Sequence, residues 1–217
     1  MTTKRKLLII LPIASILLVA IVSAIIFFSL RVTENDYFKS IQSLDFVTKV
    51  HTTTIKEGEF VVYEKKETLT FDGSKAHHEI YEKKISNSLN QMYDETFVEY
   101  FYQDNKMYYL ENDIWKEKDF NLKNNIKTYQ FKNMHFSSFD FDKKFETVGT
   151  FNGNIKNEYS KTIFGNQTNY KDAKLTIIVD KDFSLQSFVV VAKTDNNRDV
   201  LISGEYDYTP KNITIPN

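Results

Sequence analysis

The chain has 217 residues, with 28 basic side chains, 29 acidic side chains and no cysteine. The lack of cysteine excludes a disulfide-stapled scaffold, a lipidated cysteine and a cysteine nucleophile. The near-balance of charge excludes a strongly basic chain of the kind that binds nucleic acid.

The first predicted element is a helix that spans a membrane. Residues 7–30 form an uncharged, mainly apolar run behind the basic cap Lys4-Arg5-Lys6. Such a helix reaches about 36 Å, against a hydrocarbon core of about 30 Å. Only Arg31 follows the run closely, so the positive-inside rule predicts a cytoplasmic N-terminus. The predicted division is a cytoplasmic cap at 1–6, a single-pass signal anchor in the cell membrane at 7–30, and an extracytoplasmic domain at 31–217.

A cleaved signal peptide is the main alternative to this anchor. Its apolar stretch is usually about 7 to 15 residues long, and Val22-Ser23-Ala24 is a passable cleavage site. The apolar run continues past that site, which favours an uncleaved anchor whose partner is the lipid bilayer.

Leaving out Lys4, Arg5, Lys6 and Arg31, the exterior domain has 24 basic and 29 acidic residues, a net charge of −5. This charge disfavours nucleic acid and anionic lipid headgroups as its main partners.

A short amphipathic helix is predicted just after the anchor. Thr33 resembles an N-cap with acidic residues in the first turn. Tyr37, Ile41, Leu44 and Val47 then follow at helical spacing.

From about residue 50 the apolar pattern has a period of two. It is clearest in three sets of residues, which are Val61, Tyr63, Leu69 and Phe71; Leu175, Ile177 and Val179; and Val200, Ile202, Tyr206 and Tyr208. Turn signals separate the runs, at Glu57-Gly58, Asp72-Gly73, Asp104-Asn105, Asn152-Gly153, 180–182 and 195–197. Without crossover helices, these runs predict antiparallel strands. The fold class is mainly β (α+β), with a curved antiparallel sheet or half-open β-barrel covered by one or two short helices. Residues 117–145 fit a loop, a short helix or an edge strand.

Some strands are apolar on both faces, as in 97–102, 107–110 and 188–192. Such a strand is expected to be covered on both faces. One helix is too little to cover so much apolar surface, so some of these side chains are candidates to line an apolar cavity. The candidates are Phe97, Tyr100, Tyr102, Tyr109, Trp115, Phe188 and Val190. The alternative is that the aromatic side chains only fill the core of the sheet and make cross-strand pairs.

The last forty residues carry a resemblance to a known superfamily. LTIIVDKDF at 175–183 is followed by a hairpin at 188–208 and by the tail NITIP. This pattern is similar to the C-terminal half of the LolA-like/LppX-like bacterial lipoprotein carriers, and residues 102–110 resemble a hairpin of its firmicute members. The resemblance implies a half-open antiparallel barrel with an apolar cavity for lipid or acyl chains. An anchor helix in place of a lipidated cysteine implies a tethered domain rather than a shuttling carrier.

No pattern for catalysis, cofactor binding or metal binding is found. His77 and His78 are adjacent in a strand, so they point to opposite faces and cannot chelate one metal together, and His51 and His135 are isolated. The loop 195–199 has oxygen ligands but lacks EF-hand spacing. There is no Gly-rich phosphate loop and no G-x-S-x-G motif. We therefore predict no catalytic residues, no cofactor and no metal.

Two functions remain from the sequence. The favoured one is a non-enzymatic, membrane-tethered domain that binds a hydrophobic ligand such as a lipid or an acyl chain. The alternative is a filled β domain that presents an edge strand or an aromatic surface to a cell-envelope protein. A large apolar void inside the domain would favour the first.

Overall fold

The computed structural model describes residues 16–26, 31–87, 92–142, 149–165 and 169–216. Residues 16–26 are helical, but no helix among the described residues is both long and apolar enough to cross a membrane. The rest of the predicted anchor, at 7–15 and 27–30, lies outside the described residues, as does the cap at 1–6. The anchor therefore stays a prediction.

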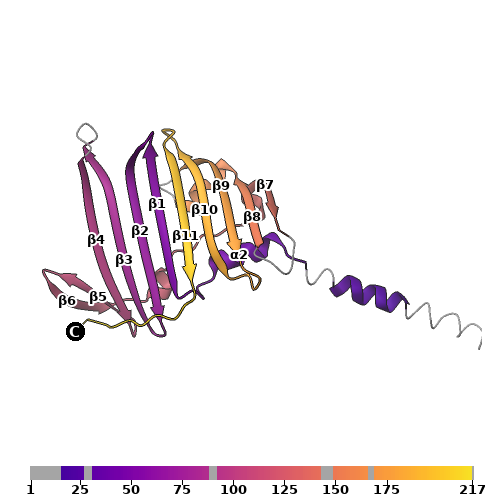
Figure 1. Cartoon of the computed structure of the whole chain (residues 1–217), viewed down its shortest axis with the longest axis horizontal. Coiled ribbons are helices and arrows are strands. Elements are labelled where there is room, and N and C mark those ends of the chain that lie inside the picture. The colour runs from indigo at the N-terminus through magenta and orange to yellow at the C-terminus, as the bar shows by residue number, and fades with distance from the viewer. Residues whose placement is uncertain (1–15, 27–30, 88–91, 143–148, 166–168, 217) are drawn as a thin grey trace, which may run out of the picture.

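The domain is built on one open antiparallel sheet of eleven strands (Figure 1). The spatial order is β6-β5-β4-β3-β2-β1-β11-β10-β9-β8-β7, so the first and last strands pair at its centre. The strands are β1 (Thr48–Glu57), β2 (Phe60–Asp72), β3 (Lys75–Asn87), β4 (Met92–Gln103), β5 (Lys106–Glu111), β6 (Ile114–Asp119), β7 (Phe136–Phe141), β8 (Gly149–Ile155), β9 (Tyr170–Val179), β10 (Leu185–Thr194) and β11 (Asp199–Asp207). The predicted curved antiparallel sheet is confirmed, and it is unclosed, with β6 and β7 as its edges.

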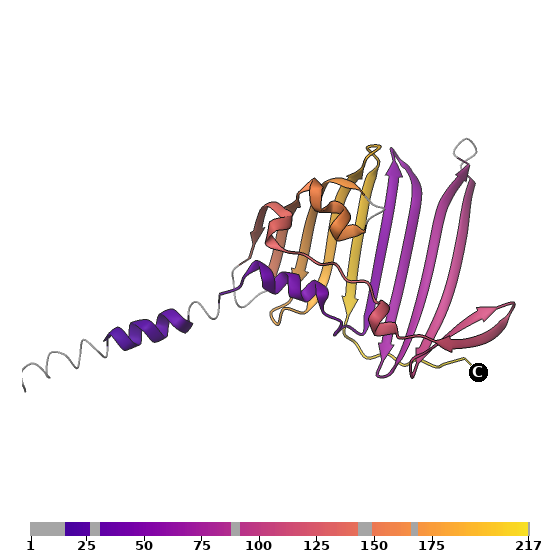
Figure 2. The same cartoon turned by 180° about the vertical axis from the view of Figure 1, so that it is seen from behind.

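Short helices cover one face of this sheet (Figure 2). They are α2 (Glu34–Gln42), α3 (Leu122–Asn125) and α4 (Ser160–Phe164), with 3-10 turns η1 (Asn133–His135) and η2 (Asn157–Tyr159). The segment 120–135 runs across the same face from β6 to β7, and so joins the two edges of the sheet. We call this face the covered face and the opposite one the open face.

Helix α2 forms as its N-cap pattern predicts. The carboxylate of Asp36 accepts hydrogen bonds from the backbone N–H (2.7 Å) and hydroxyl (2.9 Å) of Thr33, which satisfies an otherwise free donor at the helix start. Tyr37, Phe38 and Ile41 are buried against the sheet. The helix ends at Gln42, so Leu44 and Val47, predicted to continue its stripe, lie beyond it, and Leu44 is exposed.

The predicted turns are confirmed at five of six places, at 57–58, 72–73, 104–105, 180–182 and 195–197. Asp104 and Asn105 both have positive φ, as a tight hairpin turn requires. The sixth prediction is wrong, because Asn152-Gly153 lies inside β8. The ring of Phe136 on β7 occupies the space where a Cβ of Gly153 would be. This glycine therefore allows close packing rather than a turn.

The prediction that the doubly apolar strands are covered on both faces is also wrong. On β10, Phe188, Val190 and Ala192 are buried under the helices, whereas Val191 on the open face is 53% exposed. On β4, Tyr102 is buried and Phe97 is 60% exposed. In the described part of the chain, α2, α3, α4 and the crossing segment all lie on the covered face, and no helix covers the open face.

The covered face carries two separate apolar clusters. The larger lies under α2 and α4, over β8 to β11, and contains Tyr37, Phe151 and Phe188. The smaller lies over β2 to β5 and is centred on Leu69, Tyr102 and Met107. Between them, the inner side chains of β1 and β2 are largely polar.

Candidate functional site

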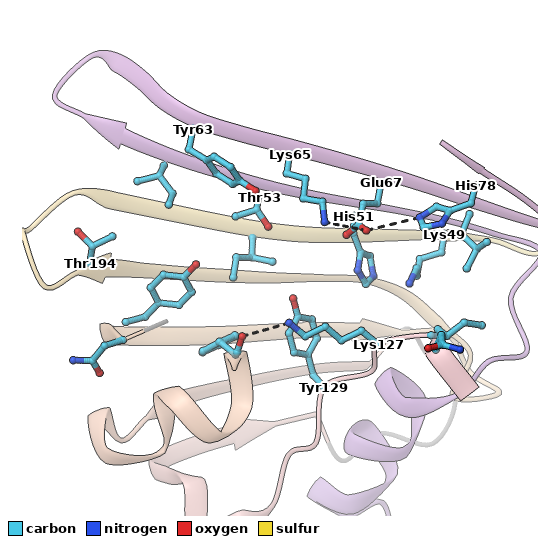
Figure 3. Close-up of a pocket in the computed structure, with 18 of the residues that line it drawn as sticks. Lys49, His51, Thr53, Tyr63, Lys65, Glu67, His78, Lys127, Tyr129 and Thr194 are labelled. Carbon is cyan, nitrogen blue, oxygen red and sulfur yellow. Dashed lines mark hydrogen bonds and ion pairs between the residues drawn. The ribbon is translucent and has the colours of Figure 1, made fainter. Parts of the chain in front are cut away.

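A pocket of about 660 Å³ lies between the two apolar clusters (Figure 3). Its floor is the covered face of β1, β2 and β3, and its opposite wall comes from 122–129, α4 and the turn between β10 and β11. From Lys49 to Ile55 it extends about 20 Å along β1 at the strand's rise per residue. The apolar lining residues are Ile55, Leu69, Leu122, Ile126, Phe164 and Ile202, and the polar or aromatic ones include Lys49, His51, Thr53, Tyr63, Lys65, Glu67, His78, Lys127, Tyr129, Tyr170 and Asp195.

Strand register brings the polar floor residues together. Lys49 is opposite Leu69, His51 is opposite Glu67 and Thr53 is opposite Lys65, so alternate residues of β1 and β2 share the covered face. His78 on β3 is in turn opposite Leu69. Polar side chains therefore occupy a face of the sheet that is apolar on either side.

Glu67 is the ion-paired centre of this floor. Its carboxylate lies 3.2 Å from Lys65 Nζ and 3.8 Å from His78 Nε2. The nearby imidazole of His78 is the largest cause that lowers the pKa of Glu67, to about 2, and Lys65 adds to it against the effect of burial. Glu67 is therefore charged at neutral pH.

His51 is a neutral side chain of the pocket floor. Its Nε2 lies 2.7 Å from the Tyr206 hydroxyl, and its ring packs edge-on against Phe188 with centroids 5.2 Å apart. Burial is the largest cause that lowers the pKa of His51, and Lys49 adds to it, whereas Glu67 opposes the shift. Together these effects lower the pKa to about 3. Burial raises the pKa of Tyr206, so its hydroxyl stays protonated.

Lys49 and Lys127 are the other cations of the pocket. Lys49 is buried, with 9% of its surface exposed, and its Nζ lies 5.8 Å from the centre of the Phe46 ring. Burial lowers the pKa of Lys49 and Glu67 raises it. Lys127 Nζ donates to the carbonyl of Phe164 at 3.4 Å. Both lysines also line a much smaller adjoining cavity of about 10 Å³, together with His51, Ile126 and Tyr129, so they lie at one end of the main pocket.

None of the seven cavity residues predicted from the sequence lines this pocket. Phe188 and Val190 are in the larger apolar cluster, and Phe188 packs against His51. Tyr100, Tyr102 and Tyr109 belong to the smaller cluster, and Tyr102 lines a second cavity of about 320 Å³ beside the Asp104-Asn105 turn. Phe97 and Trp115 lie on the open face, where Trp115 packs edge-on against Phe101.

Sequence reasoning missed Lys49, Thr53, Lys65 and Lys127, and it treated His51 as an isolated residue. A signal was present in TKVHTTTIKE, a strand that is polar on both faces. That composition is unusual for a central strand, but only the pairing of β1 with β11 makes β1 central.

The other three histidines lie at three different places in the fold. His77 and His78 point to opposite faces, as predicted, because His78 lines the pocket and His77 packs on Phe101 of the open face with ring centroids 4.4 Å apart. His77, Glu79 and Glu99 have ligand atoms within 4.8 Å of one another, and His77 is 2.7 Å from Glu99. His135 is buried and receives a hydrogen bond from the Lys132 backbone N–H. The expectation of no metal site stays a prediction.

Comparison with known proteins finds likenesses among solved structures. No family model matches the sequence, and no curated protein matches it. The chain is similar in structure to LprF from Mycobacterium bovis, with 10% identity and a TM-score of 0.42 over 85% of this chain and 97% of that one. It is also similar to the lipoprotein LppX of Mycobacterium tuberculosis, with 11% identity and a TM-score of 0.40 over 84% of this chain and all of that one. The second bears the name LppX, which is also in the name of the superfamily that the sequence resembles.

Proposed function

We propose that the domain at 31–217 is a non-enzymatic binding module that holds a lipid or another molecule with an acyl chain in the pocket over β1 to β3. The observation that carries the proposal is the pocket itself, whose volume of about 660 Å³ is in the range of ligand sites. Leu69, Leu122 and Ile126 offer an apolar wall to a chain. Glu67 is ion-paired with Lys65, and His51 is hydrogen-bonded to Tyr206. These two floor residues are therefore held by contacts within the protein, which fits binding better than catalysis.

Ligand occupancy tests this proposal directly. The full chain, purified in detergent from its native membrane, is analysed by native mass spectrometry and by lipid extraction. Thr53→Trp fills the pocket from its floor, whereas Thr54→Trp places the same ring on the open face of the same strand. We expect Thr53→Trp alone to lose the copurified or added lipid. Equal occupancy in both variants, or no binding of any added lipid, would contradict the proposal.

We also propose that the apolar run at 7–30 tethers this domain to the outer side of the cell membrane. The full chain should remain with membranes after alkaline extraction, and external protease should degrade residues 31–217 in intact cells. A chain lacking residues 1–30 should be released. Recovery of the intact full chain as a freely soluble protein would argue against the tether.

The second candidate, an interaction module, is favoured by one observation. Phe97 and Leu110 on the open face are 60% and 51% exposed, so both are accessible to a partner protein. Replacing both by Ser should abolish capture of a defined envelope protein in cross-linked membranes if this function holds. Unchanged capture would dismiss it.

A further inference from the structure

The charges of the pocket are unequally compensated. Glu67 is ion-paired with Lys65 at 3.2 Å, and His78 Nε2 lies 3.8 Å from it. Asp195, at the exposed end of the pocket, is paired with Lys171 at 3.2 Å. Both acidic groups of the lining are thus matched by cations, while Lys49 and Lys127 have no carboxylate within 4.0 Å in the described part of the chain.

Lys49 is the more buried of the two lysines. Only 9% of its surface is exposed, and its ammonium makes no hydrogen bond to any described residue. No described side-chain nitrogen or oxygen is both fully buried and unpartnered, so Lys49 Nζ keeps contact with the space of the pocket. An ammonium that loses part of its hydration is stabilised by an anionic partner. Figure 3 shows the Lys49 side chain directed into the pocket beside His51. An anionic partner of this ammonium would therefore have to enter from the pocket.

Lys127 is exposed and offers a second cation from the opposite wall. It comes from the crossing segment, and its only described hydrogen bond is the long one to the carbonyl of Phe164. It lines both the main pocket and the small adjoining cavity, as Lys49 does. A ligand in the pocket therefore meets one cation from the floor and one from the opposite wall, with Leu122 and Ile126 beside it.

We infer that the ligand of the pocket is an anionic amphiphile, whose carboxylate or phosphate oxygen is bound by Lys49 and Lys127 while its chain lies against the apolar wall. This inference rests on the proposed binding function and adds the chemical class of the headgroup. The net charge of −5 outside the anchor disfavours an anionic membrane surface. It does not oppose a single anion inside the pocket, because neighbouring charges dominate there.

The test compares charged and uncharged forms of one chain. Binding of oleate, methyl oleate and oleoyl lysophosphatidate to the full chain is measured in neutral detergent by displacement of a fluorescent fatty acid. Oleate should bind more tightly than its methyl ester, and Lys49→Met should weaken oleate roughly tenfold to hundredfold while leaving the ester unchanged. Lys127→Met should act in the same direction. Lys66→Met makes the same change on the open face of β2 and should leave all three ligands unaffected.

The outcomes separate the inference from the function on which it rests. Tighter binding of the lysophosphatidate than of oleate assigns a phosphate headgroup, and the reverse assigns a free carboxylate. Equal binding of oleate and methyl oleate, with no effect of Lys49→Met, overturns the anionic headgroup but keeps the lipid-binding function. Failure of all three ligands to bind overturns the function as well. Lys49→Arg should restore oleate binding, because it returns the cation to the same place.

Discussion

His51 Nε2 and the Tyr206 hydroxyl lie 2.7 Å apart across the pairing of β1 with β11, although 155 residues separate them in the chain. This bond joins the first strand of the sheet to the last, at the place where the pocket floor meets the larger apolar cluster. It also fixes the imidazole of His51 against Phe188. The pocket wall is therefore assembled by contacts that form only when the whole sheet is complete.

The first prediction concerns the pH dependence of stability. The pKa of His51 is about 3 in the folded protein and 6.5 when unperturbed. Between pH 6.5 and 5 the unfolded chain therefore binds a proton that the folded chain does not, so the free energy of unfolding falls as the pH falls. The limit is about 1.4 kcal/mol per pH unit for one proton. Urea unfolding at pH 7 and pH 5 should show a smaller loss for His51→Gln than for the natural protein.

The other three histidines, His77, His78 and His135, are present in both proteins, so any contribution that they make to the difference cancels. Glu67, whose pKa is about 2, stays charged throughout the interval. An identical loss of stability in the two proteins would show that His51 takes up a proton in the folded state.

The second prediction is that Lys49→Met stabilises the ligand-free protein. Burial lowers the pKa of Lys49, which means that the folded state disfavours its charged form. A methionine of similar length removes that cost, so we expect the free energy of unfolding to rise by about 1 kcal/mol or more. Thermal or urea unfolding without lipid measures it. Lys66→Met should change stability by less than about 0.5 kcal/mol, and a clear loss in Lys49→Met would mean that the ammonium has a stabilising partner.

The third prediction concerns Glu67→Gln. The carboxylate is about one-third exposed, so solvent screens its ion pairs, and we expect a loss of about 1 kcal/mol at pH 7. Since the pKa of Glu67 is lowered from 4.5 to about 2, its contribution is present above pH 4.5 and disappears as the pH falls towards 2. The natural protein and the variant should therefore converge in stability at about pH 2. A difference that is the same at pH 7 and pH 2 would rule out a charge effect.

Local signals in the sequence predicted much of the fold. The Thr33 cap, five turns and the alternation of Leu175, Ile177 and Val179 all correspond to observed features, because caps, turns and strand faces depend on neighbouring residues. Gly153 is the exception. Its lack of a side chain leaves room for the ring of Phe136 on the neighbouring strand, and such a contact between strands does not depend on neighbouring residues in the sequence.

The site was harder to predict because it depends on long-range pairing. Of the apolar residues chosen as cavity candidates, Phe188 and Val190 are buried in the larger cluster, and Tyr102 lines the second cavity rather than the main pocket. The pocket forms where packing is interrupted, over the polar inner face of β1 and β2. Recognising that face requires the register of β1 with both β2 and β11, and the path of residues 120–135 across the sheet.

The last prediction concerns Gly204, which lies opposite His51 in the register of β11 with β1. A Cβ at this position would overlap the ring of Phe188 and lie 3.0 Å from His51 Cδ2. Gly204→Ala should therefore cost about 1–3 kcal/mol of unfolding free energy, because the Phe188 ring must move within a packed core. Ser203→Ala, its neighbour on the open face, should have little effect. If the Phe188 ring moves towards His51 it narrows the pocket, so Gly204→Ala should also weaken oleate binding, whereas unchanged stability and binding would indicate that this wall of the pocket is loosely packed.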